Sequence, residues 1–372
     1  MEKTYITKRQ FTLIVFSYIL ANDLIRGYYV LLVKQNVWVT SLICIAGAVF
    51  LFFLYSFIYK NTQYSDFKTA MEKILGKFIS KIIFFIYSVY FLVLLFFYLR
   101  DISELIQVFF ISQTQIYIIA GAILLTLLYV VCMGIEPLAR YCIILFYITI
   151  VTFVFFSSLL FTINKISFAH FLPFLPNGIK PILKVVYLKI AGVPMGELFV
   201  LLLIIQYIKP LQKKQGFKSA YIGLLLGASL LLIATLQNII FIEPEALSLS
   251  FSPAMRLLRR IDLEDYIQRL DLIVLNIIIF HAITKMFVYV FATKELIENI
   301  VPLKKPNLVP IIICPVILVA IYLFGIDYNV ILNFRMHFFI PYVNTVFEIY
   351  IPLLIILISF IRRKAILKQL QT

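Results

Sequence analysis

Charged residues are scarce in this chain of 372 residues. Only 14% of the residues are Asp, Glu, Lys or Arg, whereas 63% are hydrophobic. A soluble domain keeps roughly a quarter of its residues charged. The chain therefore has too little polar surface to cover a core of its size, which excludes an ordinary soluble protein. Lipid is the surrounding that suits the remaining apolar surface.

Cysteine and histidine are also rare. The four cysteines lie in or beside apolar runs, and neither they nor the three histidines show the spacing of metal ligands. We interpret the cysteines as packing residues and expect no metal and no cofactor. The chain also lacks a Gly-rich phosphate loop, a His-Glu-x-x-His motif and a Gly-x-Ser-x-Gly motif, so we expect no enzyme.

The net charge of +15 has two possible meanings, nucleic-acid binding or membrane orientation. The basic residues sit between long apolar runs and form no single stripe, which argues against nucleic acid. Basic connections beside apolar spans are what orient a membrane protein. About 20 Lys and Arg residues fall in one set of connections and about seven, including Arg335, in the other. This asymmetry predicts that both termini are cytoplasmic.

Apolar stretches of the length needed to cross a bilayer recur along the whole chain. The first is longer than a signal-peptide core, so we expect it to be retained as a span. We expect a single polytopic domain, residues 1–372, with about ten transmembrane helices. The predicted spans are 11–33, 37–59, 80–110, 115–134, 139–163, 181–209, 217–242, 269–292, 307–325 and 338–361.

Two of these spans contain groups that do not belong in hydrocarbon. The first contains Asn22, Asp23, Arg26 and Gly27, and the sixth contains the run 191–197, Ala-Gly-Val-Pro-Met-Gly-Glu. Broken backbone at membrane depth occurs only where it is buried in protein or lines a cavity. Interrupted helices at matching positions of two halves predict an all-α, 5+5 inverted-repeat, LeuT-like transporter fold with broken helices 1 and 6. The opened ends would suit a zwitterionic amino acid; the alternative is a simple kink.

Ionisable residues inside a membrane are costly and usually functional. Asp23 in span one and Lys285 in span eight predict an ion pair that replaces a bound cation; alternatively, each reaches a water-filled vestibule. Glu197 could cap the second half of span six, couple to protons or contact a ligand. Arg100 and Glu104 lie four residues apart on span three and predict a same-face ion pair.

Three further residues of the spans need a polar surrounding. Asp101 is expected to face an outer vestibule. Tyr90 and Tyr289 fall near mid-depth in spans three and eight, where a phenol needs a partner for its hydroxyl. Either tyrosine could be a packing residue or a ligand contact.

A series of short motifs gives the chain a family resemblance. Each motif is weak, but their order and spacing together are fairly specific. They are Ile6-Thr7-Lys8-Arg9-Gln10, Asn36-Val37-Trp38-Val39, Met71-Glu72-Lys73-Ile74-Leu75-Gly76-Lys77, Leu99-Arg100-Asp101-Ile102-Ser103-Glu104, Gly134-Ile135-Glu136-Pro137-Leu138-Ala139-Arg140, Phe171-Leu172-Pro173-Phe174-Leu175-Pro176-Asn177-Gly178, Pro194-Met195-Gly196-Glu197, Arg269-Leu270-Asp271 and Ile351-Pro352-Leu353-Leu354.

In this order the motifs resemble the B subunit of GerA-type spore nutrient-germinant receptors, the spore germination permease-like family of the amino acid–polyamine–organocation superfamily. The resemblance implies the inner membrane of a spore-forming bacterium, a membrane-embedded A subunit and a lipoprotein C subunit as partners, and a small nutrient germinant as ligand. The pocket that it implies lies at the breaks of spans one and six and the middles of spans three and eight. By position, this pocket comprises Ala21, Asn22, Asp23, Tyr90, Leu94, Pro194, Gly196, Lys285 and Tyr289.

One departure bears on the ligand. Relatives have a small Gly-x-Gly-like break in span one, where this chain has Ala21, Asn22 and Asp23, and Lys285 is an unusual charge at its depth. These residues could fill the pocket, select another nutrient or mark a subunit that binds none. The alternative function is a proton-coupled amino-acid secondary transporter, because the same fold serves both.

Overall fold

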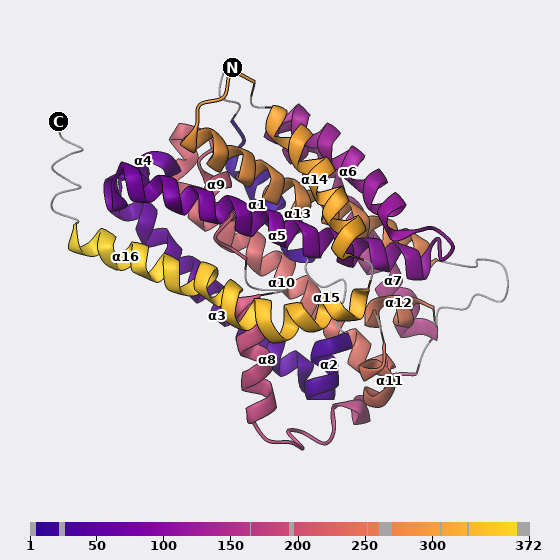
Figure 1. Ribbon diagram of the computed structural model, residues 1–372. Coiled ribbons are helices and arrows are strands. Elements are labelled where there is room, and N and C mark those ends of the chain that lie inside the picture. The colour runs from indigo at the N-terminus through magenta and orange to yellow at the C-terminus, as the bar shows by residue number, and fades with distance from the viewer. Residues whose placement is uncertain are drawn as a thin grey trace.

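The structure, a computed structural model, describes residues 5–21, 27–163, 165–192, 197–250, 252–259, 270–305, 307–325 and 327–362 (Figure 1). Within these ranges the chain is helical and has no strand beyond one isolated bridge between Ile6 and Ile208. Seven helical stretches are long and apolar enough to cross a membrane, and Leu308–Phe324 is a shorter apolar helix. The prediction of an all-helical, multi-pass membrane protein is therefore confirmed.

The helices follow one another with short connections. In chain order they are α1 (Lys8–Leu20), α2 (Gly27–Val33), η2 (Lys34–Asn36), α3 (Val37–Asn61), α4 (Phe67–Leu75), α5 (Lys77–Phe109), α6 (Ile116–Met133), α7 (Ile135–Ile163), η3 (Phe168–Phe171), α8 (Lys180–Ala191), α9 (Leu201–Ile205), η4 (Pro210–Gln215), α10 (Gly216–Phe241), α11 (Pro244–Ser248), α12 (Pro253–Leu258), α13 (Asp271–Ile300), α14 (Leu308–Phe324), α15 (Tyr328–Phe334), the π-helical segments η5 (Arg335–Asn344) and η6 (Val346–Tyr350), and α16 (Ile351–Ile361).

The two spans predicted to be interrupted each correspond to two separate helices. The first span comprises α1 and α2, and Asn22, Asp23 and Arg26 between them lie outside the described residues. The sixth comprises α8 and α9, and residues 193–196 lie outside the described residues in the same way.

The last helical stretch begins earlier in the chain than the predicted last span. The final helical stretch runs from Tyr328 to Ile361 rather than from 338, so Arg335 lies inside it and not in an outer connection. Arg335 is buried, with 3% of its surface exposed. In the sequence, Arg335 has no acidic neighbour that would indicate a buried ion pair, so the sequence pattern places it in a connection. Its partner, Asp101, lies on the distant helix α5.

Local signals explain where several helices begin and end. α1 starts with a capping box, in which the Gln10 amide donates to Thr7 Oγ1 (3.3 Å) and the Thr7 amide donates to Gln10 Oε1 (2.8 Å). Gly134, with φ of 94°, lets α6 pass directly into α7, because this left-handed backbone favours glycine. Such short turns make neighbouring helices antiparallel.

A central group of helices positions the buried polar residues. α1 packs against α10, α7 and α13, and α13 packs against α5 (Figure 1). In Figure 1, α2, α8 and α11 lie at the lower end of the molecule, and α4 and the C-terminal end of α16 lie at the left. The bundle thus has two distinct ends joined by long helices.

The contact between α1 and α10 depends on two glycines spaced four residues apart. A Cβ atom on Gly227 would lie 3.0 Å from Ile19 Cβ, and one on Gly223 would meet the backbone of Thr12. Glycines at this spacing let two membrane helices approach closely. The position of α1, and with it the site at its end, is therefore set by α10.

Replacing Gly227 should loosen this contact. We expect Gly227→Leu to lower the free energy of unfolding in detergent by about 1–3 kcal/mol or more, since overpacking forces the two helices apart. The matched control is Leu225→Ile on the same helix, where Leu225 is 45% exposed, and it should change stability little. Equal stability of both variants would contradict the close packing of α1 on α10.

Candidate functional site

A buried ion pair lies where α1, α9 and α13 meet. Lys285 Nζ, from the middle of α13, is 2.8 Å from Glu197 Oε2, and both residues are almost completely buried (0% and 1% exposed). The Tyr289 hydroxyl, one helical turn after Lys285, donates to the same carboxylate oxygen at 2.5 Å. Three of the residues predicted for the site are therefore in direct contact.

Three tyrosine rings surround the Lys285 ammonium. Nζ lies 4.8 Å from the centre of the Tyr98 ring, 5.3 Å from Tyr18 and 5.5 Å from Tyr289. Aromatic faces attract a cation at such distances, and the attraction grows when water is excluded. The cage and the carboxylate together make this cation tolerable inside the membrane.

The same tyrosines hold the ends of the helices. The Tyr98 hydroxyl donates to the Ala21 carbonyl oxygen, which follows the last turn of α1. The Tyr18 hydroxyl donates to the Glu197 carbonyl oxygen (2.7 Å), and Glu197 has a positive φ of 62°. Sequence analysis did not single out Tyr18 or Tyr98, because tyrosine is common in such spans and their partners are backbone atoms.

Several predicted site residues cannot be compared with the structure. Asn22, Asp23, Pro194 and Gly196 lie outside the described residues. The Asp23–Lys285 ion pair therefore stays a prediction. The described partner of Lys285 is Glu197, which the sequence placed in the same pocket without pairing it with the lysine.

The capping role considered for Glu197 is not the one that its contacts support. The residue before α9 is Val200, and no side chain caps that helix. The Phe199 amide in this segment instead donates to Glu348 Oε2 (3.2 Å). Glu197 is instead engaged by Lys285 and Tyr289. The acid that accepts from the backbone of this segment is Glu348, from the last helical stretch.

Glu348 forms a second buried polar centre, which the sequence analysis missed. Its side chain is 0% exposed, its Oε1 accepts from the Tyr90 hydroxyl at 3.1 Å, and the Tyr55 hydroxyl donates to its backbone carbonyl. No lysine, arginine or histidine in the described part of the chain pairs with it. The signal was present, since Glu348 is an acid in the predicted span 338–361.

Tyr90 contacts this second centre, and Leu94 lies on α5 between Tyr90 and Tyr98 of the lysine cage. Tyr90 stacks on Phe347 with ring centres 4.2 Å apart, in addition to its hydrogen bond with Glu348. Leu94, one turn further along α5, is buried apolar surface with 2% exposed. α5 therefore faces both centres, with Tyr98 towards Lys285 and Tyr90 towards Glu348.

A third group of charged residues joins α5 to the end of α14 and to η5. Asp101 pairs with Arg335, and both are buried. The expectation that Asp101 faces an outer vestibule is therefore wrong, because its charge is neutralised by Arg335 within the protein. The predicted Arg100–Glu104 pair is confirmed at 2.6 Å, and Arg100 Nε also donates to the Gly325 carbonyl oxygen at 2.6 Å.

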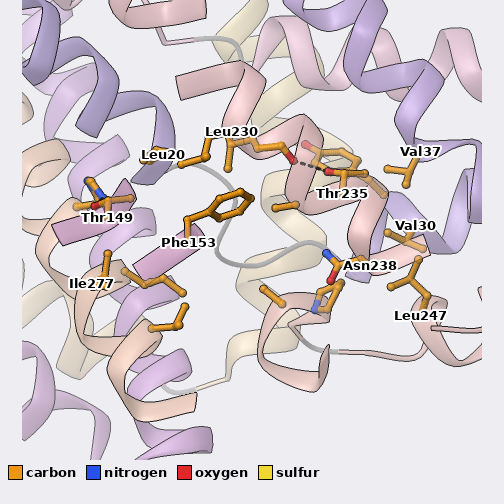
Figure 2. Close-up of a pocket in the computed structure, with 18 of the residues that line it drawn as sticks. Leu20, Val30, Val37, Thr149, Phe153, Leu230, Thr235, Asn238, Leu247 and Ile277 are labelled. Atoms are coloured by element: carbon orange, nitrogen blue, oxygen red, sulfur yellow. Dashed lines mark hydrogen bonds between the residues drawn. The ribbon is translucent and has the colours of Figure 1, made fainter. Parts of the chain in front are cut away.

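A cavity of about 160 Å³ lies beside the end of α1 (Figure 2). Its walls come from α1, α2, α3, α7, α8, α10, α11, α12 and α13, and they are mainly apolar. Figure 2 shows Phe153 in the middle of the lining, with Thr149 on one side and Asn238 on the other. None of the predicted site residues that the structure describes lines this cavity, although Leu20 precedes Ala21. No group of His, Cys, Asp and Glu suited to a metal occurs among the described residues.

The fold and these centres define a polytopic, all-helical membrane protein with ionisable side chains held inside its bundle. The chain belongs to the spore germination protein family, whose model matches residues 5–329. It is 25% identical to spore germination protein KB of Bacillus subtilis over 98% of this chain and 97% of that protein. It is also 24% identical to the putative spore germination protein YfkT of the same organism, over 90% and 89% of the two chains. Spore germination protein A2 is 25% identical over 68% of each chain.

The strength of the Lys285–Glu197 pair can be measured with a double-mutant cycle. We expect Lys285→Met and Glu197→Gln each to cost about 3–5 kcal/mol of unfolding free energy, because each leaves a buried charge without this partner. The double variant should cost less than the sum, with a coupling energy on the order of 1–3 kcal/mol.

The exposed pair Glu136–Arg140, 2.7 Å apart on α7, is the matched control. Its cycle, with Glu136→Gln and Arg140→Met, should give a coupling of at most about 0.5 kcal/mol, as for other surface helix pairs. A coupling for the buried pair no larger than that of the surface pair would contradict the buried ion pair.

Glu348 should tolerate an uncharged isostere but not truncation. A buried carboxyl group without a basic partner is best accommodated in its neutral form. We expect Glu348→Gln to change the unfolding free energy by less than about 1 kcal/mol, since the amide oxygen can still accept from the Phe199 amide while the amide NH2 group donates to the Tyr90 hydroxyl oxygen. Glu348→Ala should cost about 1–3 kcal/mol, because both donors lose their acceptor. If the two variants were equally unstable, a charged Glu348 balanced by a cation would be the better account.

Proposed function

We propose that this chain is the membrane subunit of a spore germinant receptor that senses a small nutrient and triggers germination. The observation that carries the proposal is the match to the spore germination protein family across residues 5–329, in a chain whose bundle interior holds buried ion pairs. Two relatives named as a spore germination protein and a putative spore germination protein match 98% and 90% of this chain. Amino acids or similar solutes are the nutrients that we expect.

The helix contacts support a proposed ten-crossing inverted repeat. In such a repeat the pair α1/α2 corresponds to α8/α9, α3 to α10, α5 to α13, α6 to α14 and α7 to the last helical stretch. The contact of α1 with α10 then has its counterpart in the contact of α3 with α8. α5 with α13 and α6 with α14 are contacts between corresponding helices, as a two-fold relation requires.

The proposed site of the repeat lies where the two interrupted spans meet. For it we retain the residues predicted from the sequence: Ala21, Asn22, Asp23, Tyr90, Leu94, Pro194, Gly196, Glu197, Lys285 and Tyr289. The contacts of Lys285 with Glu197 and the tyrosine cage support a role for its ammonium as a built-in cation in this space. A receptor that carries its own cation needs no coupled sodium ion.

Sensing requires two arrangements of the helices that a ligand can favour differently. The buried Asp101–Arg335 pair links α5 to η5, and the Arg100–Gly325 hydrogen bond links α5 to the end of α14. We propose that breaking these links lets the last helical stretch move relative to α5. A membrane-embedded A subunit and a lipoprotein C subunit in the inner membrane, with both termini of this chain cytoplasmic, would read that motion.

The second candidate is a proton-coupled amino-acid transporter. Glu348 favours it, because a buried acid without a basic partner among the described residues can carry a proton. Its contact with the Phe199 amide places it against the sixth span. Transport and sensing differ in whether the solute crosses the membrane.

The receptor function can be tested in spores whose only nutrient receptor is encoded by the operon that contains this gene. We expect deletion of the gene to abolish dipicolinate release in response to one class of nutrient, because no other receptor replaces it. Wild type should restore the response. Lys285→Met should not, whereas the control Lys184→Met, at an exposed position on α8, should restore it.

Unchanged germination of the deletion strain would contradict the receptor function. Purified protein in proteoliposomes, assayed with the same radiolabelled nutrient, tests the transporter. Accumulation of the nutrient driven by a pH gradient would favour the second candidate.

A further inference from the structure

The cavity beside α1 has an apolar body with a small number of buried polar atoms. Its apolar walls include Phe153, Leu230 and Ile277, and its polar lining includes Thr149, Asn238 and His281. Cavities of this composition are typical of sites for small molecules. Its volume of about 160 Å³ is close to that of an engineered apolar cavity of about 150 Å³ that binds benzene.

The hydrogen bonds of Thr149 determine the tautomer of His281. The single hydroxyl proton of Thr149 is donated to the Leu145 carbonyl oxygen (2.6 Å). His281 Nε2 lies 2.9 Å from the same hydroxyl oxygen, so Nε2 must carry the proton and donate to it. In the neutral ring, Nδ1 is then an acceptor.

Two acceptor atoms of the lining have no partner within the described residues. They are His281 Nδ1 and Asn238 Oδ1, and both are inaccessible to solvent. His281 as a whole is only 3% exposed. A buried acceptor without a donor costs free energy, and the cost is recovered when a donor binds. A ligand with a hydrogen-bond donor would therefore suit these two residues.

The remaining charged group of the lining, Lys189, makes a cation less suitable, and the two unpartnered acceptors make an anion less suitable, because an anion brings no donor. The Lys189 ammonium lies 3.2 Å from Ser41 Oγ and 5.5 Å from the centre of the Tyr29 ring, so it is engaged by the protein. Its positive charge opposes both a protonated His281 and a cationic ligand. No carboxylate lines the cavity within the described residues to balance an ammonium group. An uncharged ligand fits these groups best.

We infer that this cavity is a binding site for a small uncharged molecule that has an apolar ring or chain and a hydroxyl group as donor. The apolar part lies against Phe153 and the α10 wall, and the hydroxyl donates to His281 Nδ1 or Asn238 Oδ1 once a rotation of that side chain has opened the acceptor to the cavity. The site is separate from the lysine cage and is lined by Leu20 of α1 and Ile277 of α13, two helices that also form the cage. The proposal concerns binding alone and is independent of the receptor function.

The probe pair for the test is para-fluorophenol and para-fluorotoluene. They have nearly the same shape, but only the phenol has a donor. Fluorine NMR of each probe with the purified full-length protein in detergent gives its dissociation constant. We expect the phenol to bind at least about fivefold more tightly than the toluene, as one additional buried hydrogen bond implies.

Two kinds of variant separate the cavity from unspecific partitioning. Ala234→Phe fills the cavity from α10 and should abolish binding of both probes, whereas Ile233→Phe, at an adjacent position that is 45% exposed, should leave binding unchanged. His281→Phe and Asn238→Leu each remove one of the two acceptors, so one of these variants should weaken the phenol about five- to tenfold, and both should leave the toluene unchanged. Ala254→Phe, which fills the cavity from α12, replaces Ala234→Phe if that variant fails to fold.

Three results would overturn the proposal. The first is equal affinity for the two probes. The second is binding that survives both cavity-filling variants, which would mean that the probes partition into detergent or bind elsewhere. The third is an unchanged affinity of the phenol for His281→Phe and for Asn238→Leu. A germination phenotype has no part in this test, so its outcome does not depend on the receptor proposal.

Discussion

A lysine ammonium enclosed in the centre of a membrane bundle is the constraint on which the rest of the structure depends. Isolated charges there are expensive, so the protein must supply an opposite charge and favourable surfaces. Glu197 supplies the charge, and Tyr18, Tyr98 and Tyr289 supply the surfaces. Meeting this requirement brings α1, α5, α9 and α13 to one point. The helix ends near Ala21 and Glu197 are held by two of the same tyrosine hydroxyls, so the cation and the interruptions of the two spans form one unit.

The other buried polar groups extend this arrangement along α5. Membrane helices gain little from the hydrophobic effect when they associate, and polar contacts and close packing take a larger part. Along α5, Tyr90 contacts Glu348, Tyr98 contacts Ala21 and Asp101 pairs with Arg335. α5 therefore contacts a different part of the chain at each of these three residues. On the other side of α1, Gly223 and Gly227 allow α10 to approach, and the cavity lies between α10 and α13.

Properties that depend on composition and short-range pattern could be predicted from the sequence. These include the helical membrane class, the pair Arg100–Glu104 and the presence of two separate helices in each of the predicted first and sixth spans. Pairings between distant residues could not be predicted, because nothing local determines them. The sequence places Lys285 and Glu197 in one pocket without pairing them, and it places Asp101 at a vestibule, whereas Asp101 pairs with Arg335. Glu348 was overlooked although an acid in an apolar run is a visible signal, and the acceptor state of His281 needed the geometry of Thr149.

The enclosure of Lys285 can be measured directly by acylation of lysines in the native protein, followed by mass spectrometry. Lys180 and Lys184 are exposed on α8 and serve as internal references. The account predicts that Lys285 remains unmodified while the references react, and that it reacts in Glu197→Gln, where its described carboxylate partner has been removed. Modification of Lys285 in the wild-type protein at the rate of the exposed lysines would contradict an enclosed ammonium and, with it, the arrangement of helices around it.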